Sequence, residues 1–195
     1  MYDARANGAQ CDSCPLSGCK VIPPEGNLQA RQVFVGEAPG AQEIKLGRPF
    51  VGPSGVKLSE LLYATGGTQR KDVWITNALL CRAEVPDKEG KKRYDVKEYM
   101  AWIRRENVRR KRANKQLASG SVPFPEIRNP FDCCAPRLYA ELRWFDQQAL
   151  TAGAPNGVVV VPMGNFALGM LTAKPGTARG VMKYRGSVLR PGEGQ

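Results

Sequence analysis

Short apolar runs alternate with amphipathic stretches and glycine-rich loops along this chain. Apolar residues dominate 32–36 and 72–76 ("DVWIT"), and each run has the length of a short strand. The segment 157–164, "GVVVVPMG", is a continuous β-branched run, which is typical of a strand buried on both faces of a sheet. The pattern therefore predicts three strands that lie far apart in the sequence.

Between and after these strands, apolar residues are spaced for helices. Leu58, Leu61 and Leu62 lie on one face of a helix that Gly66 and Gly67 end. Further helices are predicted at 95–117, 135–150 and 165–171, loops at 1–30 and 37–54, and a final hairpin at 180–190. Strands separated by helices imply an α/β fold, here a three-layer α/β/α arrangement with a central, mainly parallel sheet. The length of 195 residues suits a single domain, 1–195.

Ligands of such sheets bind at the carboxyl ends of the strands, so the loops after the first two strands should share one edge. The first of these loops (36–55) reads "GEAPGAQEIKLGRPFVGPSG", and its glycines permit close backbone approach to a ligand. Within it, Glu37 is either an ordinary turn residue or an acid presented at the mouth of a site. Phe50 either stacks on a nucleobase or packs under its own loop. Asn77, after the second strand, either reads a base edge or is a turn residue.

The chain is strongly basic, with a net charge of +11 and a pI near 9.6, which favours a polyanionic partner such as nucleic acid. Residues 82–117 hold thirteen Lys or Arg and six Asp or Glu, a net of +7 and most of the total. On the helix 95–117, an apolar face is predicted from Val96, Met100, Ile103 and Val108. The outward side would carry Arg104, Arg105, Arg109, Arg110 and Arg112. These arginines form either a solvated face or, with Tyr99 and Trp102 among them, a surface that follows DNA phosphates.

The chain contains no histidine and six cysteines. The lack of histidine excludes Ser-His-Asp and Cys-His catalysis within these residues, and His-ligated zinc. No membrane span and no secretory signal are predicted, so we expect a cytoplasmic protein in which metal or cluster ligation is favoured over disulfides. "CDSC" places Cys11 and Cys14 on one turn, and Cys81 with Cys133 or Cys134 would complete four thiolates. That set suits a [4Fe–4S] cluster or an all-thiolate zinc site, and scattered buried thiols are the alternative.

Several motifs, in order along the chain, resemble those of the family 4 uracil-DNA glycosylases, the iron–sulfur branch of that superfamily. They are "CDSC", "VFVGEAPGAQE", "GRPFVGPSG", "GGTQRKDVWITNALLCR", "CCAPRLYAEL", "VVVVPMGNFAL" and "YRGSVL". The resemblance implies a [4Fe–4S] cluster on Cys11, Cys14, Cys81 and Cys134, with Cys133 as the spare cysteine.

The resemblance also implies the roles of the pocket residues. Phe50 would stack on an extruded uracil, Asn77 would read its edge, and Glu37 would sit beside the sugar and position or activate water. The backbone around the first loop would contact the uracil carbonyls, which involves Gly36, Ala38, Pro39 and Gly40. A base must leave the duplex before its glycosidic bond is reached. A nearby carboxylate then favours the cationic sugar, and donors to uracil O2 favour the anionic base.

Two features depart from the family pattern. The family has a His-Pro motif after its "RG" block, whose histidine donates to the departing uracil, whereas this chain ends at "YRGSVLRPGEGQ". Loss of one such donor typically costs about a hundred- to a thousandfold in rate. We therefore expect a truncated piece, a weakened enzyme or a non-catalytic relative. The second departure is the basic helical insertion at about 83–130, which the family does not explain.

These features predict a protein that binds uracil-containing DNA, single- or double-stranded, flips out uracil and hydrolyses its N-glycosidic bond in base excision repair. The alternative is a non-catalytic, replication-associated DNA-binding module that retains the fold and the cluster. We expect a monomer in a prokaryotic or phage-infected cell, with a replication or repair protein as a further partner. A phage origin fits, since related phage chains include domains attached to DNA polymerases.

Overall fold

The computed structural model of the chain describes residues 2–86 and 92–172. Its main sheet has four strands in the order β1-β3-β2-β6. Their bounds are Glu25–Gly26 (β1), Gln32–Gly36 (β2), Trp74–Asn77 (β3) and Val159–Pro162 (β6). Strands β3, β2 and β6 are parallel, and only the short β1 runs antiparallel to β3. The prediction of a mainly parallel sheet is confirmed.

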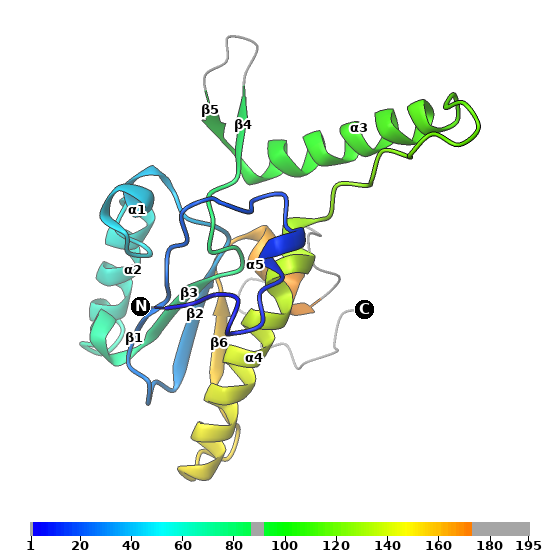
Figure 1. Cartoon of the computed structure of the whole chain (residues 1–195). Helices are drawn as coiled ribbons and strands as arrows, with labels where there is room; N and C mark the ends of the chain where they lie inside the picture. Colours follow the sequence, from blue (N-terminus) through cyan, green and yellow to red (C-terminus); the bar gives the residue numbers. More distant parts are fainter. Residues whose placement is uncertain (1, 87–91, 173–195) are drawn as a thin grey trace.

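Helices cover both faces of this sheet (Figure 1). They are α1 (Ala41–Leu46) and α2 (Pro53–Ala64) on one side, and α4 (Pro130–Thr151) and α5 (Asn165–Thr172) on the other, with short 3-10 turns at Cys11–Ser13 (η1) and Arg70–Asp72 (η2). Alternation along β2 explains the two layers, because successive side chains of a strand point to opposite faces. Phe34 packs with Leu58 and Leu62 of α2. Its neighbours Val33 and Val35 belong to the larger core with α4 and α5. This confirms the three-layer α/β/α arrangement.

Three predicted elements differ from the observed ones. The segment 37–54 is not a loop throughout, since it contains α1 and the start of α2. Helix α4 begins at Pro130 rather than 135, because the Asn129 side chain accepts a hydrogen bond from Phe131 N (3.0 Å) and proline is favoured in a first helical turn. Strand β6 is shorter than 157–164 and not buried on both faces. It pairs only with β2 among the described residues, and Val159 is 58% exposed. The hairpin predicted at 180–190 lies outside the described residues.

The basic insertion projects from the body of the molecule (Figure 1). It begins with a hairpin of β4 (Glu84–Pro86) and β5 (Lys92–Tyr94), continues as α3 (Val96–Asn114), and returns through 115–129. We call α3 and the return segment 115–129 the basic arm. The return segment lies along α3 because two asparagine side chains of the helix bind its backbone. Each asparagine accepts from the N–H and donates to the C=O of a single residue in the segment. Asn107 pairs with Ile127 (2.8 and 2.9 Å), and Asn114 pairs with Phe124 (2.8 and 3.0 Å).

Only the first half of α3 is packed against the body. Asp95 caps the helix by accepting from Glu98 N (3.0 Å), and Val96, Met100 and Ile103 are buried as predicted. Val108 was predicted for the same face but is 50% exposed, because the helix has by then left the core. No helix in 2–86 or 92–172 is long and apolar enough to cross a bilayer.

Candidate functional site

The carboxyl ends of β2 and β3 meet, as the sequence predicts. Gly36 is the register partner of Asn77. The two chains remain paired beyond the strands, since Ala78 N donates to Gly36 O (2.8 Å) and Leu79 N donates to Glu37 O (2.9 Å). The loop after β2 and the loop after β3 are therefore held side by side at one edge of the sheet.

Gly36, Phe50 and Asn77 converge at this edge. A Cβ on Gly36 would lie 2.3 Å from Asn77 Oδ1 and 2.5 Å from Phe50 Cζ, closer than any real contact of that kind. Only glycine leaves room for both the amide and the ring. Asn77 is 3% exposed, and Phe50 is half-buried beside the Phe34 core. An aromatic face and an amide thus lie against the same short piece of backbone, which is an arrangement that can hold a flat heterocycle by stacking and by hydrogen bonds.

Glu37 is anchored at the start of α5. Its Oε1 accepts a hydrogen bond from Phe166 N (3.0 Å), and a Cβ on Gly164 would lie 2.5 Å from the same oxygen. A carboxylate is favoured at this position, because the amino end of a helix carries partial positive charge. The side chain is half-buried, so one oxygen is fixed by the protein while the group stays near the strand ends. The carboxylate is therefore also a structural group, which the sequence did not indicate.

The remaining predicted residues of the first loop support its backbone path. Pro39 is buried, and Ala38 and Gly40 are half-buried. Gly40 forms the N-cap of α1, and its carbonyl accepts from Ile44 N (3.1 Å). This loop turns directly into a helix after β2, which keeps its backbone close to the strand ends.

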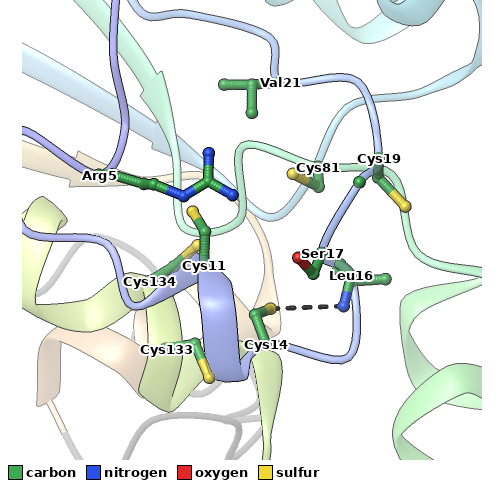
Figure 2. A pocket seen from close by; sticks show the side chains of 11 residues that line it. Arg5, Cys11, Cys14, Leu16, Ser17, Cys19, Val21, Cys81, Cys133 and Cys134 are labelled. Carbon is green, nitrogen blue, oxygen red and sulfur yellow. Dashed lines mark hydrogen bonds between the residues drawn. The ribbon is translucent and has the colours of Figure 1, made fainter.

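All six cysteines line a second site, a cavity of about 120 Å³ (Figure 2). Cys11 lies on η1 and Cys14 follows it, Cys81 follows β3, and Cys133 and Cys134 lie on α4. Figure 2 shows the Cys81 sulfur directed toward Cys11, and the Cys19 sulfur directed away from both. The four cysteines predicted as ligands therefore come together from three distant parts of the chain.

The electrostatics of the cavity distinguish the two adjacent cysteines of α4. The pKa of Cys14 and of Cys81 is raised to about 12, mainly by burial and in smaller part by negative charge on neighbouring thiols; Cys134 acts on both, and Cys133 also acts on Cys14. The pKa of Cys11 is also raised, first by burial and then by Cys134. Cys134 is thus the common neighbour of the other three. Cys133 contacts Cys14 and also lies near Cys11, but it is not among the neighbours that shift the pKa of Cys81; burial raises the pKa of Cys133, and Arg128 offsets that rise only in part.

The cavity fits a thiolate-ligated group in its chemistry. Among the described residues, Arg5 is the only Lys, Arg, Asp or Glu that lines it, and its guanidinium would favour a site of net negative charge. Within 2–86 and 92–172, no three potential ligands are close enough to bind a single metal ion as the side chains stand. Binding would therefore need rotation of these side chains about their χ angles.

Arg137, three residues after Cys134, was not singled out in the sequence. It is completely buried and pairs with Glu141 (2.8 Å). Its guanidinium donates to Thr76 Oγ1 (3.1 Å), Asn77 O (2.7 Å) and Ala78 O (3.2 Å). Glu141 in turn accepts from Trp74 Nε1. Arg137 thus connects the helix of the cysteine site to the strand end that carries Asn77.

The arginines of the basic arm are not equivalent. Arg104, Arg105, Arg109 and Arg112 are exposed, and Arg110 is half-buried. Glu106 pairs with both Arg109 (3.0 Å) and Arg110 (3.2 Å), and Arg110 also donates to Pro125 O (2.7 Å). Among the residues that the structure describes, no ion pair involves Arg104, Arg105 or Arg112.

Comparison with known proteins identifies the superfamily of the chain. The family profile of the uracil DNA glycosylase superfamily matches residues 23–188, which include both loops at the sheet edge and the whole insertion. The chain belongs to this superfamily. Curated type-4 uracil-DNA glycosylases are similar over a shorter stretch. That of Thermotoga maritima is 51% identical over 75 residues, 37% of this chain and 38% of the relative. Those of Archaeoglobus fulgidus (50% over 74 residues) and Pyrobaculum aerophilum (47% over 74) match 37% of either chain. The aligned stretch spans less than two fifths of each relative's length.

Proposed function

We propose that this member of the superfamily is a type-4 uracil-DNA glycosylase, which binds DNA, holds a flipped-out uracil and hydrolyses its N-glycosidic bond in base excision repair. The observation that carries the proposal is the convergence of Phe50 and Asn77 on Gly36. The similarity to a type-4 uracil-DNA glycosylase over 75 residues supports uracil as the base that is bound. A pocket that combines stacking with an amide suits a planar base that has both donors and acceptors on its edge.

In this proposal the site residues act on both halves of the breaking bond. The Phe50 ring stacks on uracil, and the Asn77 amide hydrogen-bonds the base edge. Backbone groups of Gly36 to Gly40, at the same sheet edge, bind the uracil carbonyls and favour the departing anion. Glu37, held by Phe166 N, keeps a negative charge beside the sugar and positions the attacking water.

We propose that Cys11, Cys14, Cys81 and Cys134 hold a [4Fe–4S] cluster, with zinc as the alternative. Such a cluster supplies covalent cross-links between distant chain segments. The position of Cys134 among the other three thiols supports it as the fourth ligand in preference to Cys133. Iron and acid-labile sulfide in the purified protein would support the cluster, and zinc with colourless protein would reject it. Cys134→Ser should lose the metal and Cys133→Ser should retain it.

We also propose that the basic arm binds DNA phosphates, mainly through Arg104, Arg105 and Arg112. The exposure of these side chains supports the assignment, whereas Glu106 partly neutralises Arg109. Each phosphate contact that is lost should lower the slope of log affinity against log salt by about one. Arg104→Ala with Arg105→Ala should therefore reduce the slope more than Arg109→Ala does. Equal slopes for the two variants and the wild type would reject the arm as a DNA surface.

The test of the proposed function is release of uracil from an oligonucleotide that contains one deoxyuridine. Wild-type protein should release uracil, and Asn77→Ala and Phe50→Ala should each reduce the rate while the metal content stays unchanged. Thymine in the same position is the control substrate and should not be released. Failure of the metal-loaded wild type to release uracil at any salt concentration would reject the catalytic proposal.

A non-catalytic DNA-binding module is the second candidate. It is favoured by one observation, namely the exposed arginines of the basic arm, which suit phosphate binding but lie on a helix that projects from the body. This candidate predicts salt-sensitive binding to DNA without base release. Measurement of binding and release on the same oligonucleotide distinguishes the two candidates.

A further inference from the structure

Phe50 has an unusual backbone conformation. It is the one non-glycine residue with positive φ (51°) in the described parts of the chain. An aromatic side chain rarely adopts this left-handed region, because its Cβ approaches the neighbouring backbone. Such a conformation persists only where the surrounding structure holds it, and residues of this kind cluster at functional sites. The contacts that hold Phe50 are therefore of functional interest.

Two charged side chains bond the backbone on either side of Phe50. Arg70 donates from Nη2 to Pro49 O (2.8 Å) and from Nη1 to Phe50 O (2.8 Å). Glu43 Oε1 accepts from the amides of Val51 (3.0 Å) and Gly52 (3.0 Å). These four bonds fix two successive carbonyls and the two amides that follow them. We call Arg70 and Glu43 the Phe50 clamp.

The arginine of the clamp is itself fixed to the sheet. Arg70 Nη2 also pairs with Glu25 Oε1 (2.6 Å), and Glu25 lies on β1 opposite Ile75. Burial disfavours the charged form of Glu25, but hydrogen bonds from Arg48 and Arg70 outweigh burial and lower its pKa. Through Glu25, Arg70 is therefore connected to β1 and to its neighbour β3, the strand that ends at Asn77.

The aromatic ring extends from this bonded stretch of backbone. Gly55 approaches the same peptide so closely that a Cβ there would lie 1.7 Å from Phe50 O, so only glycine fits at this position. With its backbone fixed in this way, the ring reaches Gly36 beside the Asn77 amide. We propose that Arg70 is a positioning residue for the stacking ring and sets how well a flipped base is held. This proposal rests on the proposed glycosylase function. A guanidinium fork suits the task because it reaches two carbonyls at once.

The test is a double-mutant cycle between Arg70 and Phe50, measured as single-turnover uracil release. Arg70→Gln should lower the rate by about 10- to 100-fold, since a misplacement of about 1 Å at a reacting site costs that much. In a Phe50→Ala background the same change should lower the rate less than about twofold, because no ring remains to position. Arg48→Gln is the matched control. Arg48 also pairs with Glu25 (2.8 Å) but makes no bond to the 49–52 backbone, so its rate should match the wild type.

An equal loss in both backgrounds would overturn the proposal, because it would show a general structural role. An NMR measurement that does not depend on enzyme activity tests the role of Arg70 separately from the proposed glycosylase function. The ring current of Phe50 acts on Gly36, so the Gly36 amide resonance should move in Arg70→Gln and stay in place in Arg48→Gln. An unmoved Gly36 resonance in folded Arg70→Gln would refute the clamp even if the wild type releases uracil. A moved resonance in a chain that releases no uracil would support the clamp and reject only the enzyme.

Discussion

Replacement of Arg137 by methionine should strongly destabilise the protein. The change removes the guanidinium from a completely buried position and leaves Glu141, whose side chain is 10% exposed, without its cation. It also removes the donors to Thr76 Oγ1, Asn77 O and Ala78 O. Loss of one partner of a buried ion pair costs about 3–5 kcal/mol. A native domain is stable by only about 5–15 kcal/mol, so this one change removes a large fraction of the total.

Thermal and urea denaturation of the metal-loaded protein measure this effect. For a chain of this size, about 1 kcal/mol shifts Tm by about 2–4 °C, so Arg137→Met should lower Tm by roughly 6–20 °C. Glu141→Met should have a similar effect, because it leaves the arginine charge buried. The double variant should cost less than the sum of the two single variants, with a coupling of about 1–3 kcal/mol.

A surface pair provides the control for these measurements. Lys57 and Glu60 on α2 form an ion pair at 3.1 Å, but their side chains are 68% and 59% exposed. Glu60→Gln should change stability by only about 0.5 kcal/mol or less. The reasoning is refuted if Arg137→Met falls in the same range as Glu60→Gln, or if the effects of Arg137→Met and Glu141→Met simply add.

Three further predictions concern the sheet edge and its support. Gly36→Ala should displace the ring and the amide and reduce uracil release, at a stability cost of about 1–3 kcal/mol; release at the wild-type rate would contradict the pocket. Glu37→Gln keeps an acceptor for Phe166 N, so it should have wild-type stability by calorimetry but release uracil slowly. Glu37→Leu should release uracil slowly and also lose about 1 kcal/mol of stability, because the helix cap is lost. Equal stability of the two variants would show that the cap contributes nothing. Because the pKa of Glu25 is lowered from 4.5, its stabilising effect is complete above that value and is lost as the pH falls through the lowered pKa. Urea denaturation should therefore show Glu25→Gln less stable than wild type at pH 7 but not well below that folded pKa, and an unchanged difference at both pH values would contradict the pairing with Arg70.

The sequence predicted the mainly parallel sheet and the edge at which Glu37 and Asn77 meet, because both depend on local pattern. Apolar runs of strand length with helices between them imply parallel neighbours, and Glu37 and Asn77 follow those runs directly. The position of Cys134 followed from a motif rather than from periodicity. Val108 was placed wrongly, because helical spacing reports a face but not where a helix leaves the core.

The supporting arginines could not be predicted, since their partners are distant in sequence. Arg70 bonds a carbonyl 20 residues away, and Arg137 bonds one 60 residues away. Arg70 has no local signal in the sequence, because it lies in a polar turn. A basic residue within a pattern of buried positions, such as Arg137 between Cys134 and Leu138 on α4, is the one clue that was present.

The cysteine cavity brings together the two ends of the segment that contains the basic arm. Cys81 and Cys134 line the same cavity, so the chain between them leaves and re-enters the body at nearly one point. The entropy of closing a loop whose ends are already together grows only slowly with length, by about 0.6 kcal/mol for each doubling. The outer part of the arm, 108–124, can therefore lengthen, shorten or acquire new side chains at a small cost, whereas Val96, Met100 and Ile103 are part of the core and cannot. This outer part is also where a replacement segment could be accepted in an engineered protein.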